Sequence, residues 1–354
     1  MMKKIKGIFK RILIVLLVII FAIAVVRTVG RGIKSRTPEG GINESMYVDI
    51  NGSKQWINIY GKNKDNPVLL YLHGGPGSPT SPYDHAFTRK WSDVYTVVTW
   101  DQRNVGKSFH KNESVEINRD VMMEDGKEMT EFLLSYLNKD KITLLGHSWG
   151  SIFGANLALE YPDYYEAFIG TGQCVDLVEN EKRLYEAAKT WTEGDEEGQA
   201  LLAKWAPGTE DSSEAIKARS ATMARYGYGM LKDGTDYSII AALLFNPNYT
   251  VIDYISFIKN LNVALEPYNK FFDDGIPGFS LTGRYDYEIP YYNIDGDKDY
   301  QTNFELACEY FEQVNAPNKK MYVMKDGTHG LLESRSEEFS EYIHDIAKIQ
   351  SEGK

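Results

Sequence analysis

The chain has 354 residues, 43% of them hydrophobic and 25% charged, a globular composition that excludes collagen, coiled-coil and disordered classes. Nine basic and no acidic residues lie in the first 36; the rest of the chain holds 30 basic and 50 acidic side chains, a formal charge of −20. Such an acidic body repels a phosphate backbone, so we expect no nucleic-acid partner. Two cysteines, Cys174 and Cys308, are too few for a disulfide framework, and no Cys/His cluster indicates a metal site.

An unbroken apolar run at residues 12–26 dominates the N-terminus. Flanking Lys and Arg side chains can reach the interface, so residues 8–29 are long enough to span a membrane. We therefore expect residues 1–36 to be an uncleaved membrane anchor, with residues 27–41 as a linker and the body outside the cytoplasm. The alternative is secretion after cleavage of a signal peptide, because Ala22-Ile23-Ala24 fits a small-x-small cleavage pattern.

The body, residues 37–354, alternates short apolar runs with helical patterns, which predicts an α/β fold with a mostly parallel sheet and helices on both faces. Strands are expected at residues 55–60, 68–72, 96–100, 142–145, 167–170, 291–294 and 320–324, and helices at residues 122–137, 151–160, 302–313 and 337–349. The stretch at residues 175–279 breaks this alternation, since it is mostly helical and rich in aromatic residues. An insertion between two strands of an open α/β sheet lies where such sheets bind ligands, so we expect a helical lid there.

A G-x-S-x-G motif, Gly146-His147-Ser148-Trp149-Gly150, follows one expected strand and precedes an expected helix. In this context the motif is typical of a nucleophile elbow, a sharp turn that projects the serine above the sheet. The N-terminus of the following helix favours negative charge that develops there. Ser148 is therefore the candidate nucleophile.

The serine needs a base and an acid, which in this fold follow it in the order acid, then histidine. Only His329 and His344 lie after Ser148, and His344 falls within an expected helix, so His329 is the candidate base. The acid should follow the preceding strand, where Asp299 lies just before the next helix. Asp297 and Asp286 remain alternatives.

A glycine-rich loop, His73-Gly-Gly-Pro-Gly77, follows the expected strand at residues 68–72. Attack on a carbonyl creates an oxyanion, which backbone N–H groups can stabilise. The candidate donors are the N–H groups of Trp149 and Gly75, since Pro76 has no N–H.

Together these segments resemble the proline iminopeptidase branch of the α/β-hydrolase family. The matching motifs are His73-Gly-Gly-Pro-Gly77, Asp101-Gln-Arg-Asn-Val-Gly-Lys-Ser108, Gly146-His-Ser-Trp-Gly150 and Gly296-Asp-Lys-Asp299, followed by His329. The resemblance covers residues 49–349 and implies Ser148, Asp299 and His329 as a triad, with Gly75 and Trp149 as the oxyanion hole. The branch usually has glycine where this chain has Asn104, a residue that tolerates left-handed backbone. Peptidases of the branch hold the substrate amine with lid carboxylates, for which Glu179, Glu181 and Glu186 are available.

The pattern predicts a serine hydrolase that forms an acyl-enzyme and needs no metal or organic cofactor. We favour release of an N-terminal residue such as proline from small peptides. Carboxylester hydrolysis is the first alternative, and a non-catalytic ligand-binding protein on a hydrolase scaffold is the second. The sequence does not indicate an oligomeric state.

Overall fold

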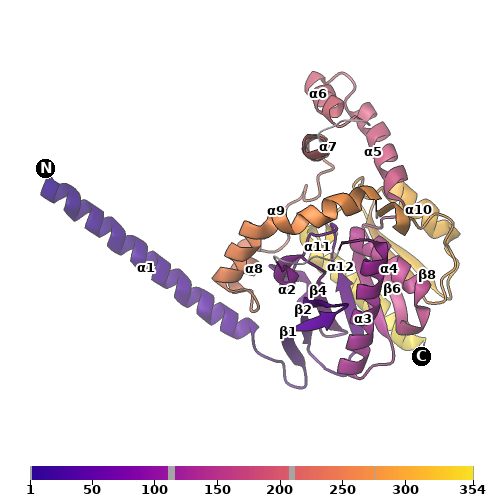
Figure 1. Cartoon of the computed structure of the whole chain (residues 1–354), viewed down its shortest axis with the longest axis horizontal. Coiled ribbons are helices and arrows are strands. Elements are labelled where there is room, and N and C mark those ends of the chain that lie inside the picture. Colours follow the sequence, from indigo (N-terminus) through magenta and orange to yellow (C-terminus); the bar gives the residue numbers. More distant parts are fainter. Residues whose placement is uncertain (1, 111–115, 207–211, 275, 354) are drawn as a thin grey trace.

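The computed structural model describes residues 2–110, 116–206, 212–274 and 276–353 (Figure 1). Its centre is an eight-stranded sheet in the order β1-β2-β4-β3-β5-β6-β7-β8. The strands are β1 (Ile42–Ile50), β2 (Ser53–Gly61), β3 (Val68–Leu72), β4 (Thr96–Asp101), β5 (Ile142–His147), β6 (Tyr165–Thr171), β7 (Tyr291–Gly296) and β8 (Lys319–Met324). Strand β2 pairs antiparallel with β1 and β4, and all other pairings are parallel. The predicted α/β-hydrolase fold, with its mostly parallel sheet, is therefore confirmed.

Both faces of the sheet are buried, which explains why its inner strands are continuous apolar runs. In β3, Leu70 and Leu72 join a core with helices α3 (Arg119–Leu137), α4 (Trp149–Glu160) and α10 (Phe304–Gln313). Leu69 and Tyr71 point to the opposite core, which α2 (His85–Thr88), α11 (Leu331–Ser334) and α12 (Ser336–Glu352) cover. Short 3₁₀ turns lie at Arg89–Trp91, Gly106–Ser108, Pro162–Tyr164 and Ile276–Phe279.

All seven expected strands and four expected helices are present, with ends that differ by a few residues. Strand β1 was not expected from the sequence. It forms the edge of the sheet, and several of its side chains are exposed, so it lacks the apolar run of the inner strands.

In the described part of the segment between β6 and β7, five α-helices are inserted: α5 (Leu177–Trp191), α6 (Glu196–Lys204), α7 (Ser212–Arg225), α8 (Ile239–Phe245) and α9 (Val251–Asp274). Figure 1 shows α9 lying across one end of the body, with α5, α6 and α7 projecting beyond it. This is the mostly helical segment that the sequence predicted for residues 175–279.

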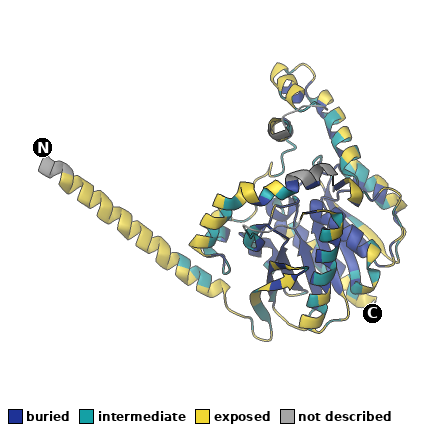
Figure 2. Ribbon diagram, in the orientation of Figure 1, coloured by how far each residue is buried: buried dark blue, intermediate teal, exposed yellow. Residues whose placement is uncertain are grey.

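The N-terminus forms one long helix, α1 (Met2–Lys34), which extends away from the body (Figures 1 and 2). Its stretch Lys6–Lys34 is long and apolar enough to cross a membrane, and an 18-residue window within it has a mean hydropathy of 3.1. The expectation of a linker at residues 27–41 was wrong for its first part, because the helix continues to Lys34. Arg27 and Arg31 are held there by hydrogen bonds to the helical insertion, which fix this end of the helix.

Candidate active site

Ser148 occupies the turn between β5 and α4, with φ 58° and ψ −122°. A positive φ is rare for a residue with a side chain and is a strained conformation that recurs at functional sites. Ser148 is half-buried in this turn. The predicted elbow geometry is thus present around this serine.

The two glycines of the motif allow three backbone segments to approach closely. A Cβ on Gly150 would collide with the carbonyl oxygen of Leu72, and one on Gly146 would collide with that of Gly150. Helix α4 therefore begins directly against the ends of β3 and β5. This close packing brings the loop after β3 to the nucleophile elbow.

His329 lies in the loop after β8 and contacts Asp299, which follows β7. The Nδ1–H of His329 donates to Asp299 Oδ2 over 2.7 Å, and both side chains are buried. Thr302 Oγ1 lies 3.0 Å from the same carboxylate oxygen, while the N–H groups of Gln301 and Thr302 donate to Oδ1. The pair fixes the ring and leaves Nε2 of the neutral imidazole as its proton acceptor.

The two alternative acids lie elsewhere. Asp297 Oδ1 accepts the backbone N–H of Asp326 (2.7 Å), and Asp286 Oδ1 accepts the side-chain amide of Asn315 (3.0 Å). His344, on helix α12, is paired with Asp93, which lies 3.0 Å away in the turn before β4. Among the candidates from the sequence, the structure brings Asp299 and His329 together.

The end of β6 brings the histidine loop and the elbow to one place. The Ser148 N–H donates to the carbonyl of Thr171 (3.0 Å), and the next residue, Gly172, lies against the His329 ring. A Cβ on Gly172 would be 2.9 Å from Cε1 of that ring. From the elbow, His147 Nε2 donates to the His329 carbonyl over 3.1 Å.

The candidate oxyanion donors flank the serine. Trp149 is the first residue of α4, and the first N–H groups of a helix have no acceptor within it. Gly74 lies so close to the elbow that its Cβ would be 3.1 Å from Ser148 Cβ, which brings the adjacent Gly75 to the same edge. Gly75 has φ 118°, a conformation accessible to glycine.

The segment Asp101-Gln102-Arg103 contacts both the glycine-rich loop and the nucleophile elbow. Gln102 accepts the indole N–H of Trp149 (3.2 Å), and its own side-chain amide donates to the His73 carbonyl (3.4 Å). Asn104, where the related branch has glycine, adopts φ 57°. The left-handed turn is therefore retained with asparagine. No specific role was predicted for Gln102, His147 or Thr302, because their contacts depend on segments distant in the chain.

Burial perturbs the titratable groups around the site. Desolvation, followed by the neighbouring His329, lowers the pKa of His147 to about 3, so His147 stays neutral. Burial, followed by the nearby Asp299 carboxylate, raises the pKa of Asp295 to about 7. Asp295 accepts the backbone N–H of Gln173 (3.1 Å) and the side-chain amide of Asn293 (2.8 Å).

The helical insertion contacts the loops of the site. Tyr268 of α9 donates to the Arg103 carbonyl (2.5 Å), and a Cβ on Gly77 would be 3.2 Å from the Tyr268 ring. The Thr328 hydroxyl, beside His329, donates to the carbonyl of Met230 in the insertion (3.1 Å). The insertion therefore lies over both the glycine-rich loop and the histidine loop.

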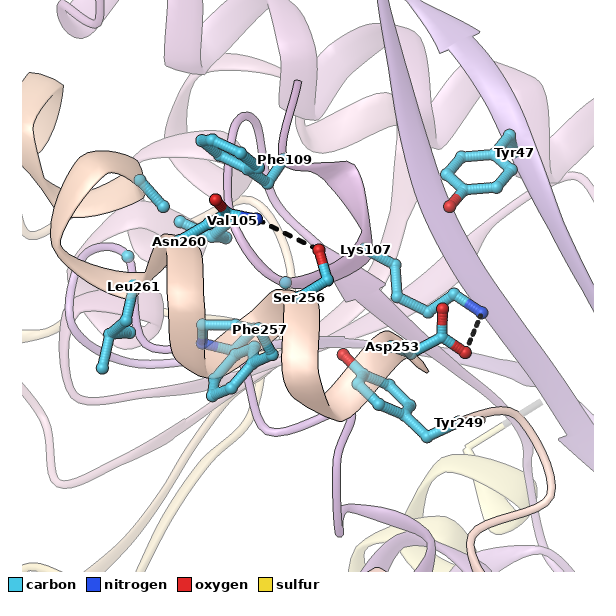
Figure 3. A pocket seen from close by; sticks show the side chains of 14 residues that line it. Tyr47, Val105, Lys107, Phe109, Tyr249, Asp253, Ser256, Phe257, Asn260 and Leu261 are labelled. Atoms are coloured by element: carbon cyan, nitrogen blue, oxygen red, sulfur yellow. Dashed lines mark hydrogen bonds and ion pairs between the residues drawn. The ribbon is translucent and has the colours of Figure 1, made fainter. Parts of the chain in front are cut away.

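A cavity of about 140 Å³ lies between α9 and the glycine-rich loop (Figure 3). Its lining includes Gly77, Phe109, Phe257 and Leu261, and Lys107 crosses its edge towards Asp253. Gly77 joins this cavity to the loop beside Ser148, although Ser148 and His329 do not line it.

The three lid carboxylates available from the sequence are all paired with basic side chains. Glu179 contacts Lys182 and Arg183, Glu181 contacts Arg219, and Glu186 contacts Lys189. Within the described residues, no group of three or more His, Cys, Asp or Glu side chains has the arrangement of a metal site.

Comparison with known proteins agrees with this architecture. Residues 67–213 match the family model described as alpha/beta hydrolase fold. The chain is 27% identical over 290 residues to the probable aminopeptidase YbaC of Bacillus subtilis, covering 80% of this chain and 89% of that protein. The structure of proline iminopeptidase from Mycobacterium smegmatis superposes with a TM-score of 0.61 at 19% identity, covering 87% of this chain and 98% of the other. A membrane phospholipase A described as a bacterial virulence factor superposes with a TM-score of 0.60 at 15% identity, covering 98% and 99%.

Proposed function

We propose that this chain, which has the α/β-hydrolase fold, is a serine hydrolase in which Ser148, His329 and Asp299 form the catalytic triad. The observation that carries the proposal is the buried hydrogen bond of 2.7 Å between His329 and Asp299, beside a serine held at positive φ. A histidine fixed by a carboxylate and a serine on an elbow are the parts that acyl transfer requires.

In the proposed reaction, His329 Nε2 accepts the hydroxyl proton as Ser148 Oγ attacks the substrate carbonyl carbon. The N–H groups of Gly75 and Trp149 stabilise the oxyanion. The proton passes from His329 to the leaving group as the acyl-enzyme forms, and water activated by His329 then releases the acid. Asp299 orients the imidazole and stabilises its charged form.

Within this class we propose a proline iminopeptidase-like aminopeptidase that releases the N-terminal residue of short peptides. The likeness to YbaC, named a probable aminopeptidase, over most of both chains favours it. Carboxylester hydrolysis is the alternative, since the same triad would act on either acyl compound. The paired glutamates of α5 are available for a substrate amine only if they leave their present partners.

The test uses the full chain in detergent, labelled with a fluorophosphonate and assayed on proline arylamides and p-nitrophenyl esters. We expect labelling that is lost in Ser148→Ala and kept in Ser151→Ala. Turnover of arylamides without turnover of esters supports the aminopeptidase, and the reverse supports the esterase. An unlabelled, inactive wild-type protein would indicate a binding protein on a hydrolase scaffold and contradict the proposal.

We also propose that α1 remains attached as a membrane anchor, with the body outside the cytoplasm. The helix is apolar over a membrane-spanning length, and its last turns are bonded to the folded body. The alternative is a secreted protein cleaved near Ala24. The intact mass of protein extracted from the membrane fraction distinguishes them, and protease access to the body in intact cells tests the side. A mature chain without residues 1–24 would contradict the anchor.

A further inference from the structure

The end of α1 is fixed to the helical insertion by arginine hydrogen bonds. The Arg27 guanidinium donates to the carbonyls of Leu244 (2.8 Å) and Tyr249 (2.6 Å). Arg31 donates to the carbonyls of Asn246 (3.0 Å) and Pro247 (2.9 Å). These carbonyls lie at the end of α8 and in the loop before α9, where a helix end leaves acceptors without partners inside the helix.

The helices α1 and α8 also pack tightly. A Cβ on Gly30 would collide with the ring of Phe245, so a side chain at this position would force that ring to move. Together with the arginine hydrogen bonds, this contact between Gly30 and Phe245 fixes the positions of α8 and α9 relative to α1. If α1 crosses a membrane, the distance of α8 and α9 from that membrane is therefore also fixed.

One face of α9 carries large aliphatic side chains that no other part of the described chain covers. Val251, Ile252, Ile255 and Ile258 recur at helical spacing and are 58%, 76%, 59% and 74% exposed, and Ile240 of α8 is 74% exposed. Residues spaced by three and four share one face of a helix. Figure 2 shows exposed residues along α8 and α9, beside the place where α1 leaves the body. A contiguous exposed apolar face of this kind marks an interaction surface.

The other side of α9 is already used. Asp253, Phe257 and Leu261 line the cavity over the glycine-rich loop (Figure 3). The side of α9 that faces the body is therefore the side with these three residues, and the aliphatic face is the opposite side. Helix α9 therefore lies between the cavity and the surroundings of the aliphatic face.

We propose that the aliphatic face of α8 and α9 (Ile240, Val251, Ile252, Ile255 and Ile258) rests in the interfacial layer of the same lipid bilayer that α1 spans. The proposal rests on α1 being an uncleaved anchor. An amphipathic helix binds such an interface by burying its apolar face among headgroups and upper acyl chains. Exposed basic side chains near this face suit anionic headgroups. They are Lys259, which follows Ile258, and Lys34 and Arg36, at and just after the end of α1. In this position α9 holds the cavity and the proposed active site at the membrane surface.

The experiment places an environment-sensitive NBD label on single cysteines of the full chain, reconstituted in vesicles of phosphatidylcholine and phosphatidylglycerol. The background is Cys308→Ser, which leaves the buried Cys174 as the other thiol. Labels are placed through Ile258→Cys on α9, Val18→Cys within α1 and Tyr136→Cys, an exposed residue of α3. Lipids with a nitroxide on carbon 5 of the acyl chain then quench labels that lie in the membrane.

We expect at least twofold quenching at positions 18 and 258 and none at position 136. Quenching at position 18 without quenching at position 258 would overturn the α9 proposal while leaving the anchor intact. No quenching at position 18 would contradict the anchor and, with it, the α9 proposal. Protection of position 258 from aqueous iodide without quenching by the nitroxide lipid would assign this face to a second copy of the chain and overturn the proposal.

Discussion

The carboxylate of Asp299 lies 2.7 Å from the imidazole Nδ1 of His329, although 29 residues separate them in the chain. This contact joins the ends of two neighbouring strands, β7 and β8. We expect Asp299→Asn to lower kcat by about 10⁴-fold, because the amide neither stabilises the imidazolium nor fixes the required tautomer. Steady-state kinetics on the best substrate of the panel provides the measurement.

The matched control for this prediction is Asp297→Asn, two residues earlier. Its carboxylate accepts the N–H of Asp326, a bond that an amide oxygen can also accept. Activity within a few-fold of wild type is expected. Equal losses in the two variants would show that Asp299 has no particular role.

Gly150 should not tolerate a side chain, because its Cβ would occupy the space of the Leu72 carbonyl oxygen. We expect Gly150→Ala to lower the free energy of unfolding by about 1–3 kcal/mol, the usual cost of inserting atoms into a packed region. Urea denaturation in detergent measures the change. Gly353→Ala is the control, since a Cβ there has ordinary contacts, and a destabilisation equal to that of Gly150→Ala would refute the explanation.

Arg103 and Asp125 form a fully buried ion pair, with two N–H···O bonds of 2.7 Å. Arg103→Leu leaves the Asp125 charge buried without its cation, so we expect a loss of about 3–5 kcal/mol of unfolding free energy. The double variant Arg103→Leu/Asp125→Leu should be less destabilised than the single one. Arg183→Ala, at the exposed pair with Glu309, should cost at most about 1 kcal/mol. A double variant less stable than Arg103→Leu would contradict this account.

The buried carboxyl of Asp295 should make stability depend on pH. Its pKa is raised to about 7 by burial and by Asp299, from about 3.9 in the unfolded chain. Between pH 4 and 7 the folded state therefore holds a proton that the unfolded state has released. The contribution of this group to the unfolding free energy falls as pH rises through that window and levels off above about 7.

Asp295→Asn removes this titration, so the stability of wild type relative to the variant should decline from pH 4 to pH 7. Urea denaturation at several pH values, in the same detergent, tests the expectation. The control Asp163→Asn removes an exposed carboxylate. Its curve of unfolding free energy against pH should run parallel to that of wild type. Parallel curves for wild type and Asp295→Asn would argue against it.

The sequence predicted the features that depend on local pattern. The apolar runs of the inner strands, such as β3, mark segments buried on both faces, and the G-x-S-x-G motif between a strand and a helix marks the elbow at Ser148. Strand β1 was missed because an edge strand has partly exposed side chains and pairs through its backbone. The glycines and Pro38 of residues 27–41 predict a linker, whereas α1 continues to Lys34, and Arg27 and Arg31 in this part of the helix bind the helical insertion.

By itself, then, the sequence determined the chain order of the inner strands and the helices between them, the fold class and the short set of residues from which a triad could be drawn. Only the tertiary structure decided that Asp299, rather than Asp297 or Asp286, meets His329, that Gln102 and His147 brace the site, and that α1 is bonded to the lid helices. The physical reason is that periodicity and turn chemistry act over a few neighbouring residues. A contact across 30 or 222 positions exists only once the sheet has brought distant strand ends and loops to one edge.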